Sequence, residues 1–273
     1  MSNLSLQIPI IGVVGRKNTG KTMIIEILVR KLVENNYRVA TAKHVNEKNF
    51  SMDTKGKDTW KHAKAGANPV ISVSNMETSI LMKDGFKDLS PEKIASLTSD
   101  VDLIFLEGFS KKTLSNKKIG KIVCVKDHKE YAEYKKQIKG NVLCFCSIKP
   151  MKRSIFRIRE DSEIIMERVK EYVKKQIEIL GILKKLPRFD CEKCGYSSCY
   201  DAAVAIYNGR IKLSDCPPLS VTQEKKTRIT VHGIEIPIQP FVSEIIQSSI
   251  IGMISTLKGV SIRGNESLNL ELT

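Results

Sequence analysis

The sequence lacks any run of eighteen consecutive apolar residues, which is about the length that a helix needs to cross a bilayer. The first residues contain an apolar stretch but neither a basic start nor a small-residue cleavage site, so we expect a buried strand there and not a signal peptide. No internal repeat or low-complexity tract stands out. We therefore expect a cytoplasmic protein without membrane contact.

Aromatic residues are scarce, at 6% of the chain, although the formal net charge is +15. Such a charge suits a polyanionic partner. However, the lysines are scattered over predicted helix faces and loops, with few aromatic side chains among them on which bases could stack. The sequence therefore does not favour nucleic acid as the main partner. Charged nucleotides, an acidic cofactor or acidic partner proteins explain the charge equally well.

The chain has 273 residues, 41% of them hydrophobic, and can bury a sizeable core in more than one domain. Short apolar runs such as IPIIGVV and VDLIFLEG alternate with segments of helical periodicity such as MIIEILVRKLVENN. This alternation predicts an α/β fold, a mostly parallel sheet with helices on both faces. We expect a first domain over residues 1–160, a linking helix over 161–185, a four-cysteine module over 186–220 and an α+β tail over 221–273.

A phosphate-binding motif follows the first predicted strand. Residues 15–22 read GRKNTGKT and match G-x-x-x-x-G-K-[ST]. Gly15 and Gly20 let the backbone curl so that N–H groups face the phosphates, and Lys21 is expected to reach the β- and γ-phosphates. The sheet is therefore expected to be P-loop NTPase-like. The predicted nucleotide-binding residues are Gly15, Lys17, Asn18, Thr19, Gly20, Lys21 and Thr22.

Three further positions are candidates for metal binding and catalysis. Thr22 is expected to ligate Mg²⁺, and Glu107, at the end of VDLIFLEG, takes the place of an acid that holds Mg²⁺ through water. A helix cap or a salt bridge is the alternative role for Glu107. Asp53 lies in the polar loop FSMDTKGKDTW, where it is a candidate for positioning metal or water. Lys21, Asp53 and Glu107 are the candidate catalytic residues.

Four segments carry a resemblance to a known family: GVVGRKNTGKT, YRVATAKH, DTKGKDTWKHAKAGA and DVDLIFLEGF. They resemble the MobB family of P-loop proteins of molybdopterin guanine dinucleotide biosynthesis. The resemblance implies a GTP-binding homodimer that assists attachment of GMP to a molybdenum or tungsten pterin, with the transfer itself carried out by a partner enzyme, MobA. The chain departs from the family after Lys43-His44, where VNEKNF lacks a further histidine that the family commonly has.

The resemblance thus implies as partners GTP, a MobA-like guanylyltransferase or a molybdo- or tungstoenzyme, and a second copy of the chain. No arginine finger is evident, and Arg16 is a poor candidate for one, so we expect no more than slow GTP hydrolysis. The segment VCVKDH is a faint match to the guanine-reading pattern N-K-x-D and lacks its asparagine. The residues themselves therefore do not decide between GTP and ATP.

Four of the seven cysteines, Cys191, Cys194, Cys199 and Cys216, are spaced C-x₂-C-x₄-C-x₁₆-C. Clustered cysteines in a reducing compartment favour metal over disulfides. A structural zinc site usually has two C-x₂-C pairs, and the second is lacking here. The run CGYSSCYDAAVAIYNGRIKLSDCPP resembles the small four-cysteine [4Fe–4S] domain of redox subunits and corrinoid proteins, and ends in Cys-Pro as bacterial ferredoxin runs do. We predict a [4Fe–4S] cluster, with zinc as the alternative.

The two motifs leave three functions open. The first is a GTP-binding accessory protein of pterin cofactor biosynthesis that carries an iron–sulfur cluster. The second is an electron-transfer protein in which the nucleotide controls the cluster. The third is a non-catalytic scaffold that delivers the cofactor to an apo-enzyme.

Overall fold

The computed structural model describes residues 8–47, 50–83, 90–98, 100–151, 154–219, 229–231 and 234–256. The chain divides into two compact units, Met1–Gln176 and Ile177–Thr273. Among the described residues, no helix combines the length and the apolar character that a membrane crossing requires. The strands are β1 (Ile10–Val14), β2 (Val39–Lys43), β3 (Val70–Val73), β4 (Thr78–Leu81), β5 (Leu103–Glu107), β6 (Gly120–Cys124), β7 (Val142–Ser147), β8 (Phe156–Arg157), β9 (Thr230–Val231) and β10 (Ile234–Glu235). The helices are α1 (Lys21–Glu34), α2 (Asp58–Lys64), α3 (Pro91–Ala95), α4 (Ser110–Leu114), α5 (His128–Gln137), α6 (Ser162–Lys185), α7 (Cys199–Tyr207) and α9 (Pro240–Ser255), with a 3₁₀ turn at Leu213–Asp215.

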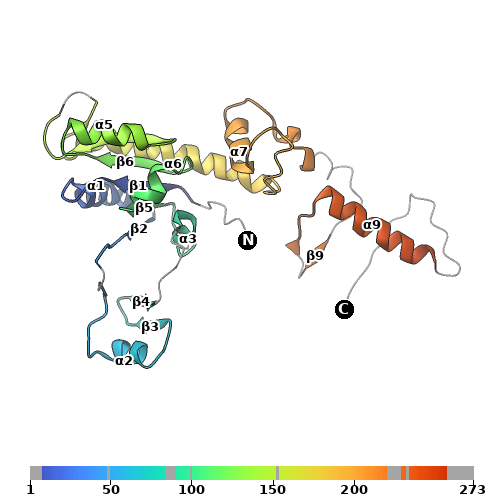
Figure 1. Ribbon diagram of the computed structural model, residues 1–273, viewed down its shortest axis with the longest axis horizontal. Coiled ribbons are helices and arrows are strands. Elements are labelled where there is room, and N and C mark those ends of the chain that lie inside the picture. The colour runs from blue at the N-terminus through green and yellow to red at the C-terminus, as the bar shows by residue number, and fades with distance from the viewer. Residues whose placement is uncertain are drawn as a thin grey trace. The chain divides into compact units, whose positions relative to one another are not determined.

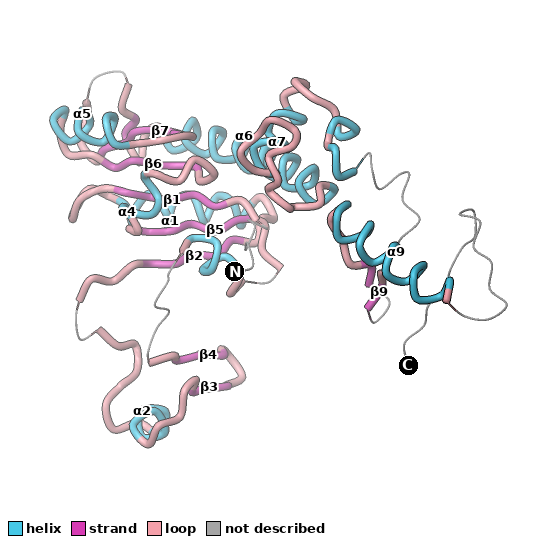
Figure 2. Tube along the Cα trace, turned by 45° about the vertical axis from the view of Figure 1, so that its right-hand side comes forward, coloured by secondary structure: helices cyan, strands magenta, loops and turns pink. Residues whose placement is uncertain are grey.

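A six-stranded parallel sheet forms the centre of the first unit, in the order β2-β5-β1-β6-β7-β8 (Figures 1 and 2). Helix α1 and the first half of α6 pack on one face. Helices α4 and α5 contribute side chains to the core on the other face. Because both faces are covered, the strands are almost entirely apolar. The predicted α/β class, with helices on both faces of a parallel sheet, is confirmed.

Strand β1 occupies the position in the sheet where ligands of this architecture bind. It lies between β5 and β6. The connection after β1 leads toward the β2 edge of the sheet, whereas the connection after the neighbouring strand β5 leads toward the β8 edge. Ligands of open α/β sheets bind beyond the carboxyl ends of the strands at such a point. The loop after β1 also runs close to β6, since a Cβ atom on Gly15 would lie 2.4 Å from the Cys124 carbonyl oxygen. Glycine at position 15 therefore brings the phosphate-binding motif close to the sheet.

Strands β3 and β4 do not join the parallel sheet. They form an antiparallel hairpin of their own, in which Ile71 lies opposite Ile80 and Val73 opposite Thr78. A four-residue connection favours this arrangement, because parallel strands need a much longer crossover. Helix α2 packs beside β3. The side chains of Ile71, Val73 and Ile80 share one face of the hairpin and are 58%, 75% and 58% exposed.

Helix α6 runs without interruption through Gly181 and belongs to both units. Its first half is part of the first unit, because it buries five side chains in the core beside α1: Ile165, Met166, Val169, Tyr172 and Val173. The second half belongs to the unit that contains the four cysteines.

Candidate functional site

The phosphate-binding motif joins the carboxyl end of β1 to α1. Gly20 precedes the helix with a left-handed backbone (φ 93°), a conformation that glycine adopts without strain. Thr19 is buried and its Oγ1 donates a hydrogen bond to the Arg16 carbonyl at 2.9 Å. The loop is thus held in shape by its own side chain, and its N–H groups lie at the N-terminus of α1, where backbone groups favour an anion.

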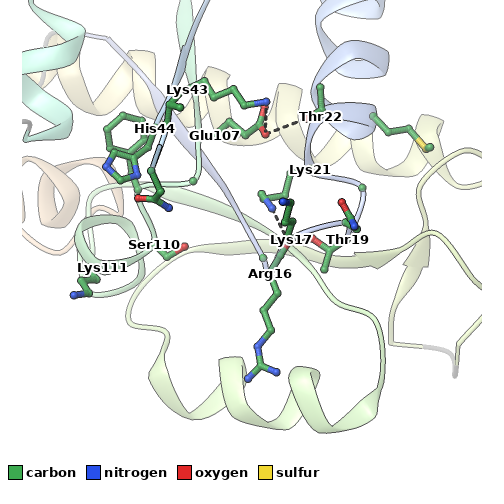
Figure 3. Close-up of a pocket in the computed structure, with 18 of the residues that line it drawn as sticks. Arg16, Lys17, Thr19, Lys21, Thr22, Lys43, His44, Glu107, Ser110 and Lys111 are labelled. Atoms are coloured by element: carbon green, nitrogen blue, oxygen red, sulfur yellow. Dashed lines mark hydrogen bonds and ion pairs between the residues drawn. The ribbon is translucent and has the colours of Figure 1, made fainter. Parts of the chain in front are cut away.

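The two basic side chains at the ends of the loop point to different places. Lys21 Nζ donates to the Arg16 carbonyl oxygen at 2.6 Å and stays over the loop. The Arg16 guanidinium donates instead to Glu133 on α5 at 2.7 Å, and lies 3.6 Å from Glu130. Figure 3 shows Arg16 directed away from Lys21 and Thr22. Lys21 therefore faces the cavity, whereas Arg16 attaches the loop to α5.

Glu107 connects the loop to the neighbouring strands. Its Oε1 accepts a hydrogen bond from Thr22 Oγ1 at 2.9 Å and lies 3.2 Å from Lys43 Nζ (Figure 3). Lys43 ends β2 directly opposite Glu107 at the end of β5. The structure thus brings Thr22 and Glu107 together and adds a cation beside them. The binding of Mg²⁺ by these two residues stays a prediction.

Residues 15–23 line a cavity of about 1150 Å³, and residues 43–47 and 107–112 form the rest of its wall. Pockets for small ligands usually measure ~300–1,000 Å³, so this cavity is large enough for a nucleotide. Two lining side chains are acidic, Glu47 and Glu107. Six are cationic: Arg16, Lys17, Lys21, Lys43, Lys111 and Lys112. This excess of positive charge suits a polyphosphate.

The third candidate catalytic residue, Asp53, does not line this cavity. Its carboxylate is 4% exposed, accepts a hydrogen bond from Thr59 Oγ1 at 2.8 Å and lies 3.6 Å from Lys83 Nζ. These contacts connect the polar loop to α2 and to the end of the hairpin. A role of Asp53 in positioning metal or water stays a prediction.

The cavity also contains residues to which the sequence analysis gives no role. Lys43 and His44 follow one another at the end of β2, and the His44 ring contacts Phe109, with ring centroids 5.2 Å apart. Phe109 has a positive φ of 46°, a conformation that is strained for a bulky residue and is often found at functional sites. In the sequence, the basic pair at the carboxyl end of a predicted strand could have indicated Lys43 and His44 as site residues.

The four cysteines of the second unit line one small cavity together with residues of the surrounding loops. Cys199 begins α7, and its N–H donates to the Asp190 carboxylate at 2.6 Å. Cys199 and Cys216 are buried, whereas Cys191 and Cys194 are partly exposed. Burial raises the pKa of both the Cys199 and the Cys216 thiols. The chain thus folds so that cysteines separated by up to 25 positions face one space.

Across the described residues, no three His, Cys, Asp or Glu side chains are gathered closely enough to hold a single metal ion. The [4Fe–4S] cluster, with zinc as the alternative, stays a prediction.

Comparison with known proteins gives the chain a family. Residues 10–147 match the family model of "Molybdopterin guanine dinucleotide synthesis protein B", MobB, which spans half of the chain. The chain belongs to the MobB family. A second family model, described as "Putative Fe-S cluster", matches residues 186–218, the segment that holds the four cysteines. The family expected from the four N-terminal segments is thus confirmed.

Relatives of this MobB-family chain differ in how much of it they share. The "Putative molybdopterin-guanine dinucleotide biosynthesis adapter protein" of Methanocaldococcus jannaschii is 31% identical over 255 residues, which are 92% of each chain. The "Molybdopterin-guanine dinucleotide biosynthesis adapter protein" of Haemophilus influenzae is 33% identical over 110 residues, 40% of this chain and 61% of the relative. A crystal structure titled as molybdopterin-guanine biosynthesis protein B covers 60% of this chain and 99% of its own, with 26% identity and a TM-score of 0.46.

Proposed function

We propose that this MobB-family chain is a GTP-binding adapter in the synthesis of a molybdenum or tungsten pterin guanine dinucleotide cofactor, and that its second unit carries a [4Fe–4S] cluster. The observation that carries the proposal is the positively charged cavity, in which Lys21 and the Thr22–Glu107 pair meet at the carboxyl end of β1. The names of the relatives, adapter proteins of the same pathway, support the choice of pathway.

The residues of the cavity fit a nucleotide with Mg²⁺. The loop amides and Lys21 would hold the β- and γ-phosphates, as in other P-loop proteins. Thr22 and Glu107 would hold Mg²⁺, because a hydroxyl and a carboxylate oxygen are the hard ligands that this ion prefers, and they already lie 2.9 Å apart. When bound, Mg²⁺ neutralises charge on the phosphate oxygens.

The same geometry supports slow GTP hydrolysis. Rapid phosphoryl transfer in such sites usually needs an arginine that reaches the transferred phosphate. Arg16, the basic residue of the loop nearest to that role, is paired with Glu130 and Glu133 on α5. Its guanidinium therefore attaches the loop to α5 and points away from Lys21 and Thr22, which would hold the phosphates and Mg²⁺.

The proposal predicts guanine-selective binding by the anaerobically purified full chain. We expect calorimetry with Mg²⁺ to show GTP binding at least roughly tenfold more tightly than ATP, a difference of about 1.4 kcal/mol. We also expect the chain to increase the rate at which a MobA-like guanylyltransferase forms the pterin dinucleotide. Binding of neither nucleotide would contradict the proposal, and normal binding without stimulation would favour the delivery scaffold instead.

The hairpin of β3 and β4 supports a homodimer. Ile71, Val73 and Ile80 form an apolar face without a charged side chain, and both strands of the hairpin have one edge without a partner among the described strands. Exposed apolar strands of this kind tend to pair with another chain. A second copy of the chain offers the same face and the same free edges, so the contact is self-complementary.

Two charged substitutions test the dimer. We expect the double variant I71K/I80K to move the chain from dimer to monomer in analytical ultracentrifugation, because two ammonium groups on each copy would face one another across an apolar contact. The matched control is I164K on α6, where Ile164 is 51% exposed and lies outside the hairpin. A double variant that stays dimeric would show that the contact lies elsewhere.

Electron transfer is a second candidate function, and one observation favours it. Cys191 and Cys194 are partly exposed, so one edge of a cluster held by the four cysteines would lie near solvent, where a redox partner can approach. A redox titration of the cluster with and without GTP separates the two functions. A midpoint potential that moves with GTP supports control of electron transfer by the nucleotide.

A further inference from the structure

Lys43 holds an unusual position for a basic side chain. Its Nζ lies 3.2 Å from the same Glu107 oxygen that accepts the Thr22 hydroxyl. The register of β2 with β5 places Lys43 directly opposite Glu107, so the pair follows from the backbone and does not depend on a flexible loop. The Glu107 carboxylate is 13% exposed. A partly buried acid needs a cation nearby, and Lys43 is the cation that the strand supplies.

The ammonium of Lys43 occupies the Glu107 oxygen that a metal ion would take and would therefore compete with it. If Thr22 and Glu107 take up Mg²⁺, as proposed above, a divalent charge comes to the oxygen that Lys43 now contacts. Two cations at that distance repel strongly in a site that is partly shielded from water. Lys43 must then leave Glu107. Its side chain is 57% exposed, so the four-carbon stem can turn without disturbing the core.

The cavity limits where the displaced ammonium can go. Lys43 lines the same cavity as the phosphate-binding loop, and its Nζ lies beside Glu107 and close to Thr22 of that loop (Figure 3). The acceptor that best suits it there is the terminal phosphate of a bound triphosphate, which carries oxygens that a diphosphate lacks. Lysine binds phosphate as a mobile point charge, which suits a group that must change partners.

We propose that Lys43 is a positioning residue that pairs with Glu107 in the absence of metal and turns to the terminal phosphate when Mg²⁺ and a nucleoside triphosphate bind. The proposal rests on the proposed function and adds a residue to it. It has two consequences. Lys43 keeps the metal-free cavity from taking up Mg²⁺ without a nucleotide, and it makes the site select a triphosphate over a diphosphate.

Calorimetry on the full chain tests both consequences with the variant K43M, which keeps an unbranched side chain one atom shorter and removes its charge. With Mg²⁺ present, we expect the ratio of GTP to GDP affinity to fall at least roughly tenfold, because one charge-assisted contact to the terminal phosphate is lost. Without nucleotide, we expect free Mn²⁺ to bind at least roughly tenfold more tightly, because Glu107 no longer has a competing cation. The variant K43R keeps the charge and should restore much of the GTP preference.

The matched control is K111M, which removes one positive charge from the rim of the same cavity. It should weaken GTP and GDP equally and leave their ratio and the Mn²⁺ affinity unchanged. An unchanged GTP-to-GDP ratio in K43M, or unchanged Mn²⁺ binding, would overturn the proposal and leave Lys43 as a structural partner of Glu107. If the natural chain itself binds no GTP, the proposed function fails. If the natural chain binds GTP and only the K43M results differ from those expected, the proposed function stands and the role of Lys43 fails.

Discussion

Replacing Lys21 with alanine is expected to abolish the binding of nucleoside triphosphates. Its Nζ lies over the loop, 2.6 Å from the Arg16 carbonyl oxygen, where a phosphate can take its place as the acceptor. Each charge-assisted hydrogen bond contributes about 1.5–3 kcal/mol, and Lys21 is placed to reach both the β- and the γ-phosphate. We therefore expect a loss of GTP affinity of at least roughly a hundredfold in calorimetry.

The matched control for K21A is K129A, because Lys129 is an exposed lysine on α5 and does not line the cavity. We expect K129A to bind GTP as the natural chain does. The two variants should unfold at similar temperatures, since the Lys21 contact lies at the surface. If K21A keeps its GTP affinity within about threefold and is folded, the assignment of this loop as the phosphate site is wrong.

Replacing Cys199 with serine is expected to remove the cluster. Cys199 is buried and begins α7, so no other thiol can move into its place without breaking the helix start that Ser198 and Asp190 hold. We expect the natural chain, purified without oxygen, to contain about four irons and four acid-labile sulfides, and C199S to contain almost none. The brown chromophore should disappear with the iron.

Cys144 supplies the control for this experiment. It is buried in β7, outside the four-cysteine module, and C144A should keep its iron and sulfide. Loss of iron from both variants would point to general unfolding, and circular dichroism would detect it. One zinc per chain without sulfide would contradict the cluster and make the module a zinc site.

The strands of the sheet are predictable because they are buried on both faces. The run LIFLE of β5 is almost wholly apolar, and such runs indicate central parallel strands whatever their partners are. The hairpin of β3 and β4 shows the limit of this reasoning. Its residues have strand propensity, but nothing in VISV or TSIL tells whether they join the main sheet or pair with one another. The sequence does not predict helix α5, because HKEYAEYKKQ is almost entirely polar.

The candidate site likewise has one part that the sequence predicts and another that it does not. The loop of residues 15–22 is predictable because its geometry is local, set by glycines at fixed spacing. The contact of Lys43 with Glu107 joins residues 64 positions apart and exists only because β2 lies beside β5 in one register. The pairing of Arg16 with Glu133 spans 117 positions and depends on where α5 lies. Both contacts need the strand order, which no local pattern contains.

Helix α6 has a practical consequence for anyone who wishes to study the two halves of the protein apart. A truncation at residue 160, where the apolar strands end, would remove five core side chains and expose the face of the sheet beside α1. A fragment that contains the phosphate-binding motif and keeps its core should therefore extend to about Gln176, where the first compact unit ends. The cysteine fragment, in turn, should begin with the second half of the helix, which belongs to its unit. One helix thus sets the cutting point for both fragments.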